Sequence, residues 1–250
     1  MKNWLVGTSV PFSPLILPVR RRGGASGGGL AQYYGTGPGQ IPGDWRIDEP
    51  TLSGSSVMAV RNDGGAGAAF ALSQSGANPV PIREGLFMRT NAGERLKIAA
   101  TADMVGTHFM APLQPTADRV AALLWQGGGA EAYYEARLGL FVLRNASGGV
   151  LAQISYTPIA APVIYEMRWD GTTVSLIING VVVNSATTAP TASWPAKIIG
   201  TGTGSARAYA GLIGRCISVI IAPGYTAAAP EPAVLVARQT LAAQYGITLP

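Results

Sequence analysis

The fold is decided by the stretch from Val163 to Ser185, which reads Val-Ile-Tyr-Glu-Met-Arg-Trp-Asp-Gly-Thr-Thr-Val-Ser-Leu-Ile-Ile-Asn-Gly-Val-Val-Val-Asn-Ser. Large apolar side chains recur at every second position from Val163 to Trp169, and the charged residues Glu166 and Arg168 fall between them. A period of two is typical of a half-buried strand, with one apolar face and one polar face.

Two short turns divide this stretch. Asp170-Gly171 follows the first strand, and Asn179-Gly180 separates the apolar runs 174–178 and 181–183. Asp-Gly and Asn-Gly supply the positive φ angles that tight hairpin turns require. The sequence therefore predicts three consecutive antiparallel strands in a meander.

The composition sets the scale of the fold. The chain has 250 residues, of which 48% are hydrophobic and only 12% charged, with 33 glycines and 18 prolines. This favours one large all-β domain, or such a domain plus an arm, because many strands need many turns. The low charge fits a subunit that buries surface in an assembly, and equally a stable, weakly charged sandwich.

Residues 1–45 differ from the rest and are predicted to form an extended arm and linker, with the β-sandwich spanning 46–250. Prolines interrupt any helix or central strand there, and Gly23 to Gly29 has a flexible linker composition. The alternatives are an arm that orders against a neighbouring subunit and a disordered tail; we favour the arm because many large apolar residues are costly to leave in water. The candidate assembly residues are Trp4, Phe12, Leu15, Ile16, Leu17, Arg20, Arg21 and Arg22.

Short strands recur after residue 45, joined by turn signals at a spacing near ten residues, which predicts a sandwich or jelly roll. The expected strands are 57–61, 86–90, 95–99, 107–111, 120–126, 137–144, 150–156, the meander, 197–199 and 212–221, with a proline-rich link through Pro112 and Pro115.

One helix is predicted near the end of the chain. Pro232 fits its first turn, and Gly246 ends it. We expect it to pack on an edge or end of the sandwich, with Arg238 extending its charged group to water. Its expected buried face consists of Val234, Leu235, Arg238, Leu241, Ala242 and Tyr245.

The order of these motifs resembles concanavalin A-like (LamG-like) lectin/glucanase domains over residues 48–250. The meander resembles their central hairpins, and the region 57–99 resembles their opening, with its loop Asn62-Asp63-Gly64-Gly65-Ala66-Gly67. The ending, Ala210-Gly211-Leu212-Ile213-Gly214 followed by a helix that closes on residues 243–247, is similar to that of such domains on bacteriophage virion proteins. The resemblance implies a concanavalin A-like jelly-roll β-sandwich.

By this resemblance we expect a structural virion protein: a fibre, spike, tail or surface-decoration subunit of a bacteriophage or phage-like particle. The arm would attach to other virion subunits, and the exposed sandwich would contact host surface polysaccharide; an arm and a weakly charged surface also favour a homo-oligomer. The alternatives are a carbohydrate-binding adhesion module without a virion and, less favoured, a glycan hydrolase. Prolines interrupt the apolar start of the chain, so we expect synthesis in the host cytoplasm without a signal peptide, and no membrane insertion.

No catalytic residues are predicted, so we expect a protein that is not an enzyme. Hydrolases of the resembled family carry Glu-x-Asp-x-x-Glu, whereas Glu131 and Glu135 lack the middle acid and would lie ~13 Å apart along a strand, too far for the usual glycosidase pair. A Ser/His/Asp triad would need His108, but no Gly-x-Ser-x-Gly motif is present.

Carbohydrate binding calls for accessible aromatic side chains with polar neighbours. Tyr133 and Tyr134, beside Gly127 to Gly129, are the main candidates, with Trp125 and then Trp194 next. A position at the core edge or in a contact between subunits is the alternative for each. Adjacent residues of a strand point to opposite faces, so one of the two tyrosines is expected to be accessible.

We expect no cofactor, although calcium is possible because many lectin relatives bind it through loop oxygens. The candidates are Asn62 and Asp63, for which a plain turn is the alternative. The single histidine and the single cysteine, His108 and Cys216, are expected to be packed strand residues. The net charge of +5 comes partly from Arg20 to Arg22, and no aromatic residues interleave with basic ones, so no nucleic-acid partner is expected.

Overall fold

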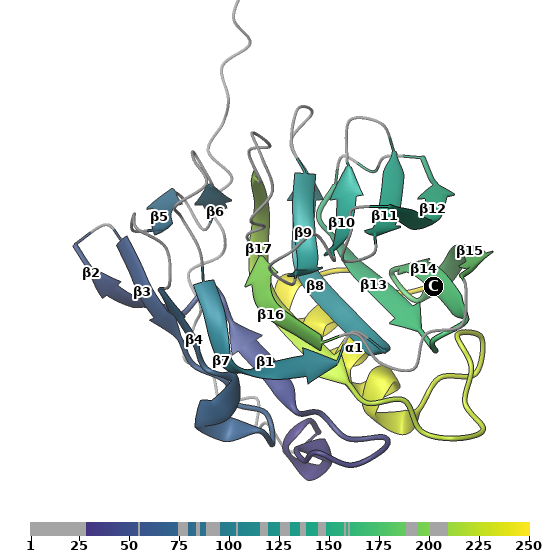
Figure 1. Ribbon diagram of the computed structural model, residues 1–250, viewed down its shortest axis with the longest axis horizontal. Coiled ribbons are helices and arrows are strands. Elements are labelled where there is room, and N and C mark those ends of the chain that lie inside the picture. Colours follow the sequence, from purple (N-terminus) through teal and green to yellow (C-terminus); the bar gives the residue numbers. More distant parts are fainter. Residues whose placement is uncertain are drawn as a thin grey trace, which may run out of the picture.

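A computed structural model of the chain describes residues 29–54, 56–74, 80–83, 86–88, 96–103, 105–115, 120–125, 131–135, 139–144, 149–157, 159, 161–188, 195–200 and 210–250. These residues form two packed β-sheets and one α-helix (Figure 1). The prediction of an all-β sandwich with a C-terminal helix is confirmed.

The first sheet carries the helix and is called the helix-side sheet. Its strands follow the order β15-β14-β13-β8-β17-β1, and each neighbouring pair is antiparallel. Short β6 pairs with the other end of β17. The bounds are β1 (Gly43–Arg46), β6 (Leu86–Met88), β8 (Gly106–Pro115), β13 (Val163–Trp169), β14 (Thr173–Ile178), β15 (Val181–Thr187) and β17 (Ala210–Val219).

The second sheet is called the opposite sheet, and its order is β12-β11-β10-β9-β16-β7-β4-β3-β2. Strand β5 (Val80–Arg83) pairs with both β3 and β6 and so joins the two sheets. The bounds are β2 (Thr51–Ser53), β3 (Ser56–Val60), β4 (Leu72–Gln74), β7 (Leu96–Asp103), β9 (Val120–Trp125), β10 (Glu131–Glu135), β11 (Leu140–Arg144), β12 (Val150–Ser155) and β16 (Pro195–Gly200).

The meander is confirmed as β13, β14 and β15, and its predicted apolar face lies between the sheets. Val163, Tyr165, Met167 and Trp169 all belong to the main hydrophobic core, where they meet residues of β3, β4, β11 and β12. Asn179 has a φ of 51° and Gly180 a φ of 87°, the left-handed pair that a tight turn needs. Local alternation and turn chemistry thus specify this region.

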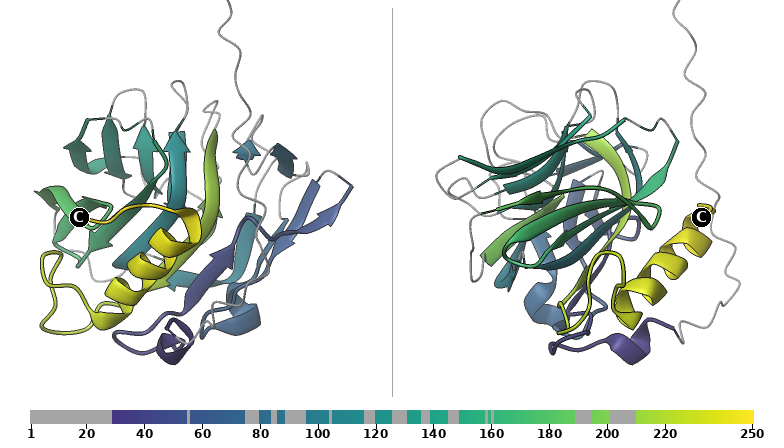
Figure 2. Two further views of the ribbon diagram at one scale, coloured as in Figure 1. Left: turned by 180° about the vertical axis from the view of Figure 1, so that it is seen from behind. Right: turned by 90° about the vertical axis from the view of Figure 1, so that its right-hand side faces the viewer.

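The helix α1 (Pro232–Tyr245) begins and ends as predicted, since Gly246 adopts a left-handed conformation with φ 65°. It lies on the outer face of the helix-side sheet, across β8, β13 and β17, and not on an edge or end of the sandwich (Figure 2). Leu235 of the expected buried face is exposed, while Ala233 and Ala237 are fully buried. The small alanine side chains allow the helix to approach the sheet closely. The predicted buried face did not include Ala233 or Ala237 because it was based mainly on large apolar residues.

The prediction that Glu166 and Arg168 lie on a polar, exposed face of β13 is wrong. Every residue of this strand is buried, because α1 and the loop before it cover the second face. Arg238 does not extend to water either, since its guanidinium is bonded to Glu166. The two charged residues of β13 are therefore buried in ion pairs and do not face water.

The predicted boundary at residues 45 and 46 falls inside β1. Trp45 is fully buried and stacks on Phe70 with ring centroids 6.1 Å apart. Leu30 and Ile41 pack in a second hydrophobic cluster with α1, and a 3-10 turn, Ala31–Tyr33, lies between them. Residues 29–45 are therefore part of the folded domain. The predicted arm residues from Trp4 to Arg22 lie outside the described residues.

Most predicted strands are present, with bounds that differ by a few residues. The expected link through Pro112 and Pro115 is wrong, because both residues belong to β8. The register between β8 and β13 shifts beside Pro112, between the pairs of Val163 and Tyr165, as expected for a residue without an N–H in a central strand. Strands β1, β2, β4 and β5 were not predicted; each is only three or four residues long.

Candidate functional site

The sandwich has two outer sheet faces, and α1 covers the middle of the helix-side sheet over β8, β13 and β17. Two ion pairs connect β13 to α1 and to Glu231, the residue that precedes α1. Arg238 donates from Nε and Nη2 to the two carboxylate oxygens of Glu166, at 2.6 and 2.9 Å. Arg168 donates from Nη1 to both oxygens of Glu231, at 2.9 and 2.7 Å, and from Nη2 to the carbonyl of Tyr225 at 2.9 Å.

Both pairs are almost completely removed from water. Burial raises the pKa of Glu166, and the hydrogen bonds and positive charge of Arg238 oppose that rise. The Glu231 carboxylate also accepts the N–H of Ala222 at 3.0 Å. Because these donors and acceptors already bind one another, the charged groups of the two ion pairs are not free to bind a ligand.

The opposite sheet has no described α-helix on its outer face, and most residues of the predicted carbohydrate site lie on its strands (Figure 2). Strand β9 is the central element: it pairs with β10 on one side and with β16 on the other. Trp125, at the end of β9, has Glu131 of β10 and Ile198 of β16 as its register partners.

The two tyrosines follow in β10. Tyr133 is the register partner of Ala122 and Val142, and Tyr134 of Ala121 and Phe141. The register against β9 shifts between Ala132 and Tyr133, which marks a bulge. Bulges of this kind re-aim side chains. The structure thus brings Trp125, Tyr133 and Tyr134 onto adjacent strands within a few residues of one another.

Trp194 lies outside the described residues, but Pro195, the next residue, begins β16. Because Ile198 pairs with Trp125, the first residues of β16 and the last residues of β9 lie at the same end of the sheet. For Trp125, Tyr133 and Tyr134 the structure describes the backbone only. The use of these four residues in carbohydrate binding therefore stays a prediction.

The two carboxylates considered for hydrolysis, Glu131 and Glu135, are the first and last residues of β10. The sequence analysis considered them on one strand, but 131–135 is not among the strands that it predicted. Along such a strand their Cα atoms are separated by about 13 Å, beyond the ~5 to 9.5 Å between the carboxyl groups of glycosidases.

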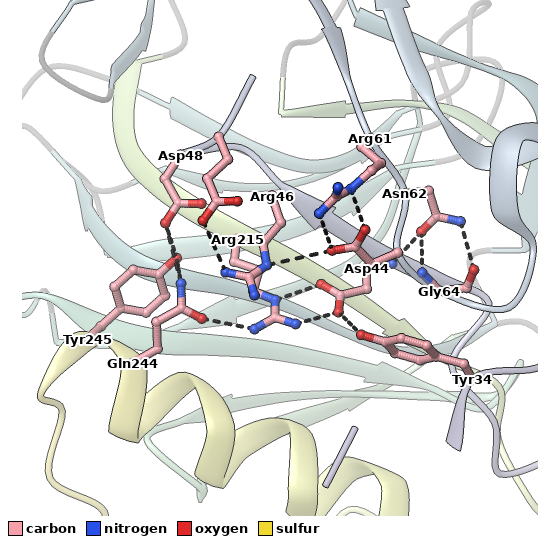
Figure 3. A network of polar contacts seen from close by, with 12 residues as sticks. Tyr34, Asp44, Arg46, Asp48, Arg61, Asn62, Gly64, Arg215, Gln244 and Tyr245 are labelled. Atoms are coloured by element: carbon pink, nitrogen blue, oxygen red, sulfur yellow. Dashed lines mark hydrogen bonds and ion pairs between the residues drawn. The ribbon is translucent and has the colours of Figure 1, made fainter. Parts of the chain in front are cut away.

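A polar network that sequence reasoning missed lies where β1, β17 and the end of α1 meet (Figure 3). At its centre Arg215 donates from Nε to Asp44 Oδ1 at 2.6 Å and from Nη2 to Asp44 Oδ2. Tyr34 donates to Asp44 at 2.7 Å, and Arg215 Nη1 donates to Gln244 at 2.9 Å.

The network continues along the helix end. Gln244 donates to the hydroxyl of Tyr245, which donates to Asp48 at 2.9 Å. Burial is the main cause that raises the pKa of Tyr34, of Tyr245 and of Asp48. The pKa of Arg215 is raised because its bonds to Asp44 outweigh the effect of burial. Because these polar side chains bind one another, the network connects residues 34–48 to β17 and to the end of α1. Since it joins residues up to 197 positions apart, no local signal reveals it.

The calcium candidates have other partners. Asn62 Oδ1 accepts the N–H groups of Asp44 and Gly64 at 2.7 and 3.0 Å, and its Nδ2 donates to the carbonyls of Pro42 and Gly67. Asp63 forms an ion pair with Arg61 at 2.5 Å. Because the Asn62 side-chain oxygen already accepts two hydrogen bonds and Arg61 lies beside Asp63, these two residues do not fit a calcium ion. The described residues contain no group of three or more metal-ligating side chains.

His108 and Cys216 are packed strand residues, as predicted. His108 is buried, with Nδ1 2.8 Å from the hydroxyl of Ser218 on the neighbouring strand. Cys216 lies in the main core, where burial raises the pKa of its thiol. No helix within the described residues is long and apolar enough to cross a membrane.

No protein-family model matches the sequence, and no curated protein is significantly similar to it. Solved structures similar to the fold include a β-glucanase of Bacillus licheniformis, with 13% identity, a TM-score of 0.42, and coverage of 71% of this chain and 98% of that one. A lichenase from a mouse hindgut metagenome has 12% identity, a TM-score of 0.38, and coverage of 51% and 71%. The Caenorhabditis elegans galectin LEC-6 has 16% identity, a TM-score of 0.33, and coverage of 50% and 94%. Likeness at this level concerns the β-sandwich alone.

Proposed function

We propose that this protein is a non-catalytic, glycan-binding β-sandwich module and that its binding face is the outer face of the opposite sheet around β9, β10 and the start of β16. One observation carries the proposal: α1 covers β8, β13 and β17 on the outer face of the helix-side sheet, whereas the candidate aromatic residues belong to, or directly adjoin, strands of the other sheet. We therefore assign the proposed binding surface to the opposite sheet.

The chemistry of these residues suits sugars. Aromatic rings offer flat apolar area to the C–H face of a sugar ring, and the polar tip of tyrosine can bind hydroxyl groups. Trp125 and Glu131 are register partners, and Tyr133 follows two residues later. The short separation of these three positions along the paired strands supports contact of all three with one or two sugar units. In this proposal Glu131 and Glu135 bind hydroxyl groups and perform no hydrolysis.

The place of the module is the second part of the proposal: a surface subunit of a bacteriophage-like particle, made in the host cytoplasm, whose residues 1–28 attach it to other virion subunits. Support comes from the resemblance of the chain's ending to virion domains and from the apolar, proline-rich sequence of those residues. Mass spectrometry of purified particles tests this part. If the protein is absent from the particles, the alternative is a carbohydrate-binding adhesion module that does not belong to a virion.

The deciding experiment for the first part is glycan-array binding by the full chain, with bacterial envelope polysaccharides included. We expect saturable binding that falls at least about tenfold in Tyr133→Ala, since loss of one stacking ring costs on the order of 1.4 kcal/mol. Tyr133 is chosen because its register partner Val142 alternates with the core residues Phe141 and Leu143. The matched control is Tyr225→Ala, because Tyr225 is an exposed tyrosine in the loop before α1, bonded through its carbonyl to β13.

Three outcomes discriminate the alternatives. Binding lost in Tyr133→Ala and kept in Tyr225→Ala supports the proposed face. Equal loss in both variants, or no binding to any glycan, overturns it. Release of new reducing ends from a bound polysaccharide shows a hydrolase instead. Repeating the array with EDTA tests calcium; unchanged binding is expected, since Asn62 and Asp63 are occupied by protein groups.

A further inference from the structure

The helix α1 has an outer face without charge, turned away from both sheets (Figure 2). Surface helices usually carry charged side chains on the face opposite the core. Of the 14 residues of α1 only Arg238 is charged, and it is buried in the ion pair with Glu166. The exposed residues of the helix are Pro232, Leu235, Gln239 and Ala243. Leu235 alone is exposed by 41%. This face is therefore suited to contact with an apolar, uncharged segment.

The chain enters the described fold beside this face. A side chain at Gly29, the first described residue, would begin 3.1 Å from Cγ1 of Val236 on α1. Val236 borders the exposed residues, because it follows Leu235 and lies three residues before Gln239. Leu30 is buried in the hydrophobic cluster that joins α1 to the sheet. The 28 residues that precede Gly29 are therefore attached to the fold at α1.

These preceding residues include an apolar segment that also has no charge. Residues 4–19 read Trp-Leu-Val-Gly-Thr-Ser-Val-Pro-Phe-Ser-Pro-Leu-Ile-Leu-Pro-Val. Nine of these sixteen are large apolar residues, which are costly to leave in water. Residues 20–28 connect the segment to the fold and span up to ~30 Å when extended. Because a 14-residue helix is only about 21 Å long, the segment can reach every part of the outer face of α1.

Three prolines in this segment distinguish between the two kinds of surface that the helix-side sheet offers. The exposed edge strand β15 would take a partner strand through backbone N–H groups, which Pro11, Pro14 and Pro18 lack. A helix contacts its partners through side chains, because its backbone groups already bind one another. The prolines therefore favour α1 over β15 as the partner of residues 4–19.

We infer that residues 4–19 dock on the outer face of α1 of the same chain. The attachment at Gly29 selects this occupant, since a short tether keeps the segment at a local concentration in the millimolar range. The inference does not depend on glycan binding and goes beyond the proposed attachment to other virion subunits. A segment that covers its own helix is withheld from those subunits, so attachment would begin with its release from α1.

The test is the rate at which a cysteine in the middle of this face reacts with a maleimide. Gln239→Cys supplies the reporter in the full chain, and Cys216 does not compete because it is buried in the core. We expect the reporter to react at least about tenfold more slowly than in a chain that also carries Phe12→Asp/Ile16→Asp. A segment docked for ~90% of the time leaves the thiol accessible for only the remaining tenth.

The matched control is Ser53→Cys, at an exposed position of β2 in the opposite sheet. Its reaction rate should be the same with and without the two aspartates. Equal rates for the Gln239→Cys reporter in the two chains overturn the inference, as does an equal slowing of both reporters. Glycan binding and incorporation into particles are measured separately, so their failure leaves these rates unchanged.

A second measurement keeps the test valid should the aspartate variant aggregate. A nitroxide on Ala243→Cys, at the end of the same face, should broaden the indole N–H resonance of Trp4, which Trp4→Phe identifies. An unbroadened resonance overturns the inference. So does broadening that requires mixing of nitroxide-labelled and unlabelled copies, because the segment then covers α1 of another molecule.

Discussion

The two faces of β13 are made from alternate residues of the same seven-residue strand, and they are stabilised differently. The inner face places Tyr165, Met167 and Trp169 in an apolar core between the sheets. The outer face places Glu166 and Arg168 against α1, each in a buried ion pair. The inner face needs only apolar partners of suitable shape. The outer face needs one particular partner for each charge.

The largest expected effect comes from the inner face. Trp169→Ala should lower the free energy of unfolding by about 4 kcal/mol, because it leaves a cavity among fully buried residues and removes the bond from Nε1 to Thr188. Urea denaturation measures the change. Leu235→Ala, at an exposed position of α1, is the control and should change it by no more than about 0.5 kcal/mol. A loss below about 2 kcal/mol would mean that the core readily collapses around the missing ring.

The outer face should show a smaller loss that a second substitution reverses. Arg238→Met leaves the Glu166 carboxylate buried without its partner, which should cost about 3 kcal/mol. The double variant Glu166→Leu/Arg238→Met replaces the pair by apolar groups and should return close to the original stability. Additive losses in the double variant would show that the pair itself, and not the unpaired charge, stabilises the helix.

The pH dependence of the single variant gives an independent check. Burial raises the pKa of Glu166 even with Arg238 present, and loss of the arginine raises it further. A carboxyl whose pKa is higher in the folded state binds more protons there, so stability falls as pH rises from the unfolded to the folded pKa. The deficit of Arg238→Met should therefore be smallest in acid and grow towards neutral pH.

The same contrast explains what the sequence could predict. The meander and both ends of α1 follow from local signals: alternation, Asn179-Gly180, Pro232 and Gly246. The outer face of β13 depends on partners 63 and 72 residues away, which no local pattern reveals. At the candidate site, the sequence indicated the aromatic residues. Their proximity depends on the pairing of β9 with both β10 and β16, and the latter begins 70 residues beyond Trp125.

The packing of α1 on the sheet should have a smaller effect on stability than either face of β13. Ala237 is fully buried in the cluster that joins the helix to the sheet. Ala237→Leu should cost about 2 kcal/mol, because a larger side chain pushes the helix away and strains both ion pairs. Ala243→Leu is the matched control on the exposed side of the same helix and should be nearly neutral. The melting temperatures of the two variants measure this difference. Equal melting temperatures would mean that the helix is not closely packed on the sheet at Ala237.

The smallest expected effect belongs to the turn that leaves β13, where neither face is involved. Asp170 Oδ1 accepts the N–H groups of Thr172 and Thr173 at 2.9 and 2.7 Å and the hydroxyl of Thr172 at 2.9 Å. Burial raises the pKa of Asp170, but these bonds outweigh it, and the pKa lies below its ordinary value. Asp170→Asn should cost about 1 kcal/mol at pH 7, since a neutral amide oxygen accepts more weakly than a carboxylate.

The sign of the pH effect separates this turn from the outer face. A carboxyl whose pKa is lowered in the folded state stabilises the fold above its unfolded pKa of about 4, and that stability is lost as pH falls through the folded pKa. The difference between the unmodified chain and Asp170→Asn should therefore vanish in acid, and the unfolding free energy of both should be measured from pH 7 down to about pH 2.5. A difference that stays constant over this range would mean that the bonds depend on the shape of the turn and not on the charge. Glu166 and Asp170 lie four residues apart, and acid should favour the fold through one and weaken it through the other, because one carboxyl is buried against a helix and the other is held by amide donors in a turn.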